Sequence, residues 1–166
     1  MDIIIATSKD IDTLMDIRRE PMTEIKSSED YSTIKDLFVE YSGIKGAEGC
    51  FVSFDKELAD LKNFYSGGAI LLGYEDDAPF GCIAIKKVDD NTCEAKRLYI
   101  KPEFRGKGYA RIMLNSMIAK ARELGYKEVC FTTRPDVMGV AYKLYKRMGF
   151  EELGCDNGVV SMRINL

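Results

Sequence analysis

The sequence contains no histidine at all. Histidine is the side chain that most often acts as a general base near neutral pH, activates serine or cysteine nucleophiles and binds zinc. Its absence therefore excludes histidine proton transfer, Ser/His and Cys/His nucleophile systems and histidine metal sites. Carboxylates, tyrosine hydroxyls, water and backbone groups are left to perform any chemistry.

Signals for a membrane, for export and for nucleic acid are also missing. No apolar run approaches the length of a membrane span, and the first residues lack the basic region and long apolar core of a signal peptide. The net charge is −3 and both signs are mixed along the chain, so no basic field for nucleic acid or an anionic membrane is evident. We expect neither partner, and a soluble cytoplasmic protein.

A disulfide framework is equally absent. The five cysteines are odd in number, form no C-x-x-C pair and mostly lie in apolar, strand-like runs, which is typical of reduced intracellular thiols. We expect no metal site. With 166 residues and no repeat, linker or low-complexity segment, the chain is expected to fold as one domain over residues 1–166.

Hydrophobic periodicity and turn residues predict alternating helices and strands. Expected helices cover about 7–21, 29–42, 56–65, 109–124 and 137–148, a loop covers 44–55, and expected strands cover 2–6, 69–74, 80–88, 92–100, 128–133, 150–153 and 159–164. The three middle strands form an antiparallel meander, and the helix at 109–124 crosses over to a strand parallel to the third. The fold class is therefore α/β: a mixed, mostly antiparallel central sheet flanked by helices on both faces.

The most informative segment is a glycine-rich turn that follows a strand and opens a helix. Its six residues are Arg105, Gly106, Lys107, Gly108, Tyr109 and Ala110. Free backbone N–H groups at a helix start, with the helix dipole and two cationic side chains, suit a phosphate group. The spacing matches neither the G-x-G-x-x-G fingerprint of dinucleotide sites nor a Walker A loop.

The turn matches the [RQ]-x-x-G-x-[GA] motif that holds the pyrophosphate of coenzyme A in GCN5-related N-acetyltransferases, and the chain resembles that family from end to end. The preceding strand at 94–100, the helix at 109–124 with its Gly125 stop, and the late segment at 141–150 follow in the family's order. The resemblance implies an enzyme that transfers the acetyl group of acetyl-CoA to a primary amine. The alternative is a catalytically silent module that binds acyl-CoA and senses or regulates.

The resemblance also implies where the donor binds. The backbone of Leu98, Tyr99 and Ile100 would pair with the pantetheine arm of acetyl-CoA as an added strand. The backbone N–H of Leu98 would polarise the thioester carbonyl, and residues 105–110 would hold the pyrophosphate. The alternative interpretation is that these three strand residues are ordinary core residues. The two interpretations are compatible, because the side chains can pack in the core while the backbone binds the cofactor.

Tyr145 stands at the position of the family's general acid, where it would protonate the departing thiolate. A buried structural tyrosine is the alternative. Many family members carry asparagine three residues before the alanine at 141, where it touches the pantetheine arm, and this chain has Met138 there. Thr132, Thr133 or Arg134 are candidates to supply polar contacts instead.

An amine must lose a proton before it attacks, since an amine with a pKa of about 10.4 is almost fully charged at pH 7. Glu94 is the candidate base, because alternation on a regular strand would place it on one face with Lys96, Leu98 and Ile100. A cross-strand ion pair is its structural alternative, and a water chain is the alternative base. Arg97, expected on the opposite face, is assigned a structural or exposed role. Cys93 is expected to be a free thiol rather than a nucleophile.

The acceptor is expected to be a small-molecule amine, bound between the N-terminal helices, the segment at 44–65 and the closing hairpin. Acidic residues outnumber lysines in the first two of these segments, which favours a cationic molecule; they are Glu20, Glu24, Glu29, Asp30, Glu40, Glu48 and Asp55. The identity of the acceptor stays open. So does the oligomeric state, with a homodimer among the alternatives.

Overall fold

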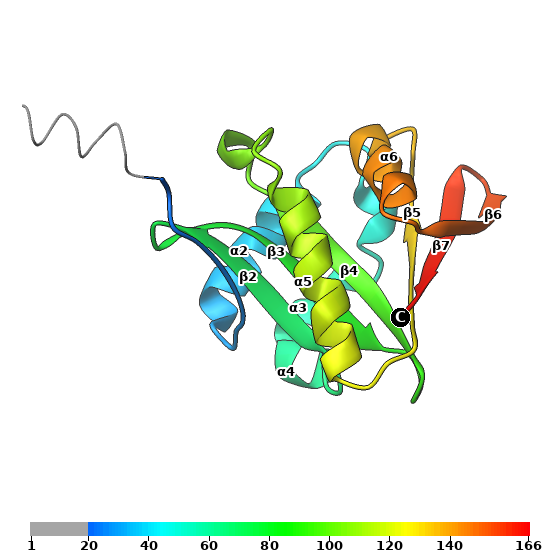
Figure 1. Ribbon diagram of the computed structural model, residues 1–166, viewed down its shortest axis with the longest axis horizontal. Coiled ribbons are helices and arrows are strands. Elements are labelled where there is room, and N and C mark those ends of the chain that lie inside the picture. The colour runs from blue at the N-terminus through cyan, green and yellow to red at the C-terminus, as the bar shows by residue number, and fades with distance from the viewer. Residues whose placement is uncertain (1–19) are drawn as a thin grey trace, which may run out of the picture.

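The computed structural model describes residues 20–166. The expected strand at 2–6, and nearly all of the helix expected to end at Pro21, lie outside the described residues. Figure 1 shows the described residues arranged as a twisted sheet with helices on both of its faces.

The described strands form one seven-stranded sheet in the order β1-β2-β3-β4-β5-β7-β6. Their bounds are β1 Thr23–Ser27, β2 Ala69–Glu75, β3 Ala78–Lys87, β4 Thr92–Ile100, β5 Glu128–Thr133, β6 Glu151–Asp156 and β7 Val159–Asn165. Every neighbouring pair is antiparallel except β4 and β5, which are parallel and joined through α5. The expected meander and crossover are confirmed, and so is the fold class.

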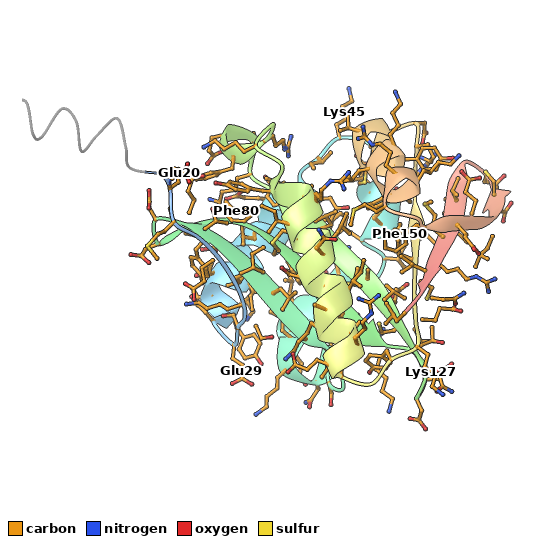
Figure 2. The ribbon with its side chains drawn as sticks, viewed as in Figure 1. Glu20, Glu29, Lys45, Phe80, Lys127 and Phe150 are labelled. Atoms are coloured by element: carbon orange, nitrogen blue, oxygen red, sulfur yellow. The ribbon has the colours of Figure 1, made fainter. Side chains whose placement is uncertain are left out.

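The helices divide between the two faces of the sheet. Their bounds are α2 Tyr31–Ser42, α3 Phe54–Ala59, α4 Leu61–Phe64, α5 Tyr109–Glu123 and α6 Gly139–Arg147, with 3-10 turns η1 at Glu48–Cys50 and η2 at Pro102–Phe104. In Figure 1, α5 crosses the front of the sheet, while α2, α3 and α4 lie behind it. Each face has its own apolar core, one built on Met113, Met117 and Phe80, which is labelled in Figure 2, the other on Ile34, Phe38 and Leu72.

Two local expectations were wrong. The helix expected at 56–65 is two short helices, because Asp60 leaves the helical conformation, with a φ of −149° and a ψ of 67°, and caps α4 by accepting a hydrogen bond from the Asn63 N–H. The segment at 44–55 is not entirely loop, since it contains η1 and the start of α3. The edge strand β1 was not expected at all. Four of its five residues are exposed, so its sequence lacks the apolar alternation that marks a strand.

The parallel pair β4 and β5 separates soon after it begins. Cα partners join only Thr92 with Glu128, Cys93 with Val129 and Glu94 with Cys130. Beyond these, β4 continues to Ile100 and β5 to Thr133 while the two strands diverge, as Figure 1 shows. The sheet is therefore split by a wedge-shaped opening between facing strand edges.

A β-bulge in β4 lies beside this opening. The register against β3 shifts so that Ile83 alone stands opposite both Arg97 and Leu98, and Arg97 has a φ of +62°. The inserted residue reverses the alternation of side chains. Leu98 and Ile100 consequently pack in the core beneath α5, whereas Lys96 approaches the Phe64 ring on the opposite face. The expectation that Glu94 and Lys96 share a face with Leu98 and Ile100 was wrong for this reason.

Candidate active site

A cavity of about 160 Å³ occupies the opening between β4 and β5. Its walls are residues 94–98 of β4 and residues 131–134 at the end of β5, and Tyr41, Cys50 and Tyr145 close it. Beyond Glu94 and Cys130, the facing backbone edges of these strands are not paired with each other. An extended molecule with amide groups can therefore hydrogen-bond to strand edges inside the sheet.

The glycine-rich turn lies where β4 ends and α5 begins. Gly106 and Gly108 have φ angles of +79° and +81°, which other residues rarely adopt. A Cβ added at either position would meet no atom within 4 Å, so backbone conformation alone requires glycine. Gly108 caps α5 without a side-chain hydrogen bond, which leaves the first N–H groups of the helix available to an anion.

The two cations of the turn already have partners. The Arg105 Nε donates to the carbonyl of Ile100 at 2.9 Å, which ties the turn to the end of β4. The Lys107 Nζ lies 3.2 Å from a carboxylate oxygen of Glu75, so part of its charge is neutralised within the protein. The backbone N–H groups of the turn are thus more available to a ligand than its two cationic side chains.

Tyr109 and Tyr99 use their side chains structurally. The Tyr109 ring stacks on Phe80 with centroids 4.2 Å apart, and its hydroxyl donates to Glu75 at 2.5 Å, a hydrogen bond that raises the pKa of Tyr109. The Tyr99 ring stacks on Tyr41 with centroids 5.6 Å apart. The side chains of both residues are therefore engaged within the protein, and neither residue lines the cavity.

Tyr145 projects from α6 into the cavity. Its ring packs edge-on against Phe131 with centroids 4.6 Å apart and against Phe150 at 6.0 Å, so its orientation is fixed by aromatic contacts. Across residues 20–166, no group hydrogen-bonds to its hydroxyl. Burial raises the pKa of Tyr145 well above its usual value near 10, so the hydroxyl keeps its proton at neutral pH. The group is thus a buried proton donor that faces the cavity.

Glu94 also lines the cavity, from the side of the sheet that carries α2. One of its carboxylate oxygens lies 3.7 Å from the Nζ of Lys96, and both side chains are partly exposed. The structural alternative was an ion pair across two strands, but the observed pair lies within β4. It does not remove Glu94 from the cavity, because a partly exposed pair at this distance is weak.

The bulge in β4 is held by a buried cluster that the sequence did not reveal. The guanidinium of Arg97 donates to both carboxylate oxygens of Glu57, at 2.9 and 2.5 Å, and to the carbonyl of Cys50 at 2.9 Å. The Tyr65 hydroxyl donates to Glu57 at 2.5 Å. The guanidinium also lies 4.2 Å from the centre of the Phe51 ring. The structural role assigned to Arg97 fits this arrangement. The expectation that Arg97 lies on the face opposite to Glu94 was wrong, because the bulge turns its side chain to the face of the sheet that carries α3.

The pKa values agree with a charged pair. Burial by itself would raise the pKa of Glu57, but hydrogen bonds from Arg97 and Tyr65 outweigh it and hold that pKa below its usual range. Burial would lower the pKa of Arg97, and Glu57 raises it instead. Glu57 and Arg97 therefore carry opposite charges in the folded protein, and together they join the segment containing η1 and α3 to the wall of the cavity.

Met138 closes the end of the cavity near α6. Its sulfur accepts a weak hydrogen bond from the Tyr41 hydroxyl at 3.6 Å, which connects the loop before α6 to α2. A thioether offers no donor and only a weak acceptor. Met138 therefore cannot replace the amide of the asparagine that is common at this position in the family.

The cysteines carry no sign of activation. All five are free thiols, and burial raises the pKa of Cys93 to about 12, so this residue is a thiol rather than a thiolate at neutral pH. This agrees with the role expected for Cys93.

The charged residues around the cavity are not the acidic residues from which a cationic acceptor was expected. None of the seven acidic residues behind that expectation belongs to the cavity wall. The charged residues that do line it are Glu94, Lys96, Arg97 and Arg134. The walls therefore give no support to selection of a cation by charge.

Two negative findings apply to residues 20–166. No helix in that range is long and apolar enough to cross a membrane. In the same range, no three histidine, cysteine, aspartate or glutamate side chains gather into a group that could hold a metal ion.

Comparison with known proteins identifies relatives of the same kind. The model of the Acetyltransferase (GNAT) family matches residues 11–150. An uncharacterized N-acetyltransferase of Schizosaccharomyces pombe is 30% identical over 134 residues, which cover 78% of this chain and 82% of the relative.

Solved structures share the fold at low sequence identity. An acetyltransferase from Streptococcus agalactiae superimposes with a TM-score of 0.72 at 19% identity, covering 87% of this chain and 98% of the other. The PaiA N-acetyltransferase of Thermoplasma acidophilum, solved in complex with coenzyme A, gives a TM-score of 0.71 at 21% identity, covering 87% and 99%.

Proposed function

The chain belongs to the Acetyltransferase (GNAT) family and is an acetyl-CoA-dependent N-acetyltransferase, and from this premise we propose that it transfers the acetyl group directly to the primary amine of a small molecule. The observation that carries the proposal is the opening between β4 and β5, whose cavity is lined by Glu94, Leu98 and Tyr145. The glycine-rich turn at residues 105–110 lies between the end of β4 and the start of α5.

The donor side of the cavity fits acetyl-CoA. The free N–H groups around Gly108 and at the start of α5 suit its pyrophosphate, and the unpaired edges of β4 and β5 suit the amides of its pantetheine arm. Acetyl-CoA supplies an acetyl group as a thioester, which an amine can attack without a covalent enzyme intermediate. Such a mechanism needs no nucleophilic side chain, in agreement with the protonated state of Cys93.

Three groups of the chain take part in the transfer. The backbone N–H of Leu98, next to the bulge, donates to the thioester carbonyl oxygen as negative charge grows there. Glu94, directly or through water, accepts the proton that the amine loses. Tyr145 donates its proton to the departing sulfur, and its burial keeps that proton available at neutral pH.

The proposed reaction is tested by measuring free thiol release from acetyl-CoA in the presence of amines. A panel of polyamines, aminoglycosides, amino acids and lysine peptides covers cationic, zwitterionic and peptidic acceptors. Mass spectrometry then identifies the acetylated product. Thiol release that depends on an amine and yields an N-acetyl product supports the proposal. Tight acetyl-CoA binding without turnover on any amine, including those in a cell extract, would favour the silent acyl-CoA-binding module.

Gly108→Ala tests the phosphate site. An alanine at a φ of +81° is strained by about 1–2 kcal/mol, so the turn relaxes in the free protein and the ligand must restore its shape. We expect the Kd for acetyl-CoA, measured by calorimetry, to rise about tenfold. Gly125→Ala is the matched control, because Gly125 has a φ of +90° and equally open surroundings at the far end of α5. Equal effects of the two substitutions on Kd would place the phosphates elsewhere.

Glu94→Gln tests the base. A glutamine keeps the size and hydrogen-bonding reach of the side chain but cannot accept a proton at neutral pH. We expect kcat/KM to fall about tenfold or more. A kcat/KM within about twofold of that of the unchanged enzyme would assign Glu94 to its ion pair with Lys96 and the proton to water.

A further inference from the structure

Thr133, the last residue of β5, has a buried hydroxyl without a partner. The residue is only 4% exposed, and no hydrogen-bond partner is found for its Oγ1 in the described part of the chain. Burying a hydroxyl without a hydrogen bond costs about 1–3 kcal/mol in proteins. The buried hydroxyl therefore lowers the stability of the free protein. A bound molecule that hydrogen-bonds to it would remove this cost.

Thr133 lines the cavity between β4 and β5. Alternation along β5 places it on one face with Val129 and Phe131, which are also buried. The ring of Tyr145 packs against Phe131 on this face. On the other edge of the strand, Thr133 stands opposite Val160 of β7. The hydroxyl is the part that lacks a partner.

Part of the cavity wall is apolar. Ile83, Leu98, Leu114 and Phe131 contribute hydrocarbon surface to the cavity. Thr133 and Tyr145 supply the hydroxyls on this side. Tyr145 is assigned to the sulfur, so Thr133 is left for a polar group farther along the same ligand.

We propose that the Thr133 hydroxyl hydrogen-bonds to an amide of the pantetheine arm of acetyl-CoA. The proposal rests on the proposed function, because it takes acetyl-CoA as the occupant of the cavity. An amide that enters the cavity loses its water and presents both a donor and an acceptor, and a hydroxyl can pair with either. Thr133 thereby replaces the amide contact that Met138, whose sulfur is engaged by Tyr41, cannot make.

Thr133→Val separates a ligand contact from a structural contact. Valine has nearly the shape of threonine but no hydroxyl, and in the free protein no hydrogen bond to a described residue is lost. We expect the Tm of the free protein to stay unchanged or to rise by about 2–4 °C. The Kd for coenzyme A, measured by calorimetry, should rise about tenfold, because a desolvated amide is left without its partner.

Two controls locate the effect. Adenosine 3′,5′-bisphosphate lacks the pantetheine arm, so its Kd should be the same for Thr133→Val and for the unchanged protein. Thr133→Ser keeps the hydroxyl and should bind coenzyme A within about twofold of the unchanged protein.

Three outcomes would overturn the proposal. Unchanged affinity of Thr133→Val for coenzyme A would show that the hydroxyl makes no contact. A lowered Tm would show that it is structural. Equal weakening of coenzyme A and the bisphosphate would point to a disturbed nucleotide site. Failure of the unchanged protein to bind coenzyme A would refute the proposed function itself, which is a separate result.

Discussion

Tyr145→Phe is expected to lower kcat about 100-fold while acetyl-CoA binds as tightly as it does to the unchanged enzyme. The substitution keeps the ring, so the edge-on contacts with Phe131 and Phe150 remain. It removes only the hydroxyl that faces the cavity. Steady-state kinetics with a saturating amine give kcat, and calorimetry gives the Kd for acetyl-CoA.

The pH dependence of this enzyme should follow from the burial of Tyr145. Because burial raises its pKa above the usual value near 10, the folded protein keeps the hydroxyl protonated through the neutral and mildly alkaline range. We therefore expect no alkaline loss of kcat from Tyr145 below about pH 10. An alkaline loss of kcat below about pH 10 that is present in the unchanged enzyme and absent in Tyr145→Phe would contradict the burial argument.

Tyr142→Phe is the matched control for Tyr145→Phe. Tyr142 lies on the same helix, only partly buried, with the ammonium of Lys146 5.3 Å from the centre of its ring. Tyr142 does not line the cavity, so the kcat of Tyr142→Phe should stay within about twofold of that of the unchanged enzyme. Turnover of Tyr145→Phe that matches this control would assign protonation of the thiolate to water.

The parts of the site that depend on local sequence could be predicted. The turn at Gly106 and Gly108 has the required positive φ angles because glycine adopts them readily. The bounds of β4 and α5 follow from apolar periodicity that ends at Pro102 and Gly125. Tyr145 could be placed because the late helix resembles the corresponding helix of the family.

The bulge at Arg97 could not be predicted in the same way. Residues 93–100 are compatible with regular alternation, and Arg97 is neither glycine nor asparagine, the residues that usually signal a positive φ. Its conformation depends on Glu57, which is 40 residues away along the chain in the short helix α3. Tertiary contacts of this kind leave no periodic signal. For that reason the side-chain faces of Leu98 and Ile100 were assigned incorrectly.

Glu57→Gln is expected to cause the largest loss of stability among these substitutions. Glu57 is 1% exposed and Arg97 is 5% exposed, so removing the carboxylate charge leaves a buried guanidinium without its counter-charge. Breaking a buried pair in this way costs about 3–5 kcal/mol, which corresponds to a fall in Tm of about 10 °C or more for a chain of this size. Thermal unfolding at neutral pH measures it.

The loss should depend on pH in a defined direction. The pKa of Glu57 is lower in the folded protein than in the unfolded chain, so its contribution is fully present above the unfolded value of about 4.3. The contribution is lost as the pH falls through the folded pKa. The difference in Tm between Glu57→Gln and the unchanged protein should therefore shrink below about pH 4. A difference that is constant from pH 7 to pH 3 would show that shape rather than charge is responsible.

Asp90→Asn controls for the loss of an ordinary ion pair. Asp90 lies 3.0 Å from the Nζ of Lys87, and its side chain is 92% exposed, so its removal is expected to leave the Tm almost unchanged. An equal fall in Tm for Asp90→Asn and Glu57→Gln would contradict the assignment of the large effect to burial.

The double substitution Glu57→Leu with Arg97→Met then separates stability from catalysis. Apolar residues of similar volume often replace a buried ion pair without loss of stability, so much of the Tm lost in Glu57→Gln should return. Catalysis should not return, because nothing then holds residue 97 at a φ of +62° and the N–H of Leu98 loses its fixed direction. We expect kcat to remain at least tenfold below that of the unchanged enzyme. Recovery of both Tm and kcat would mean that the ion pair supports the fold alone and that the bulge persists without it.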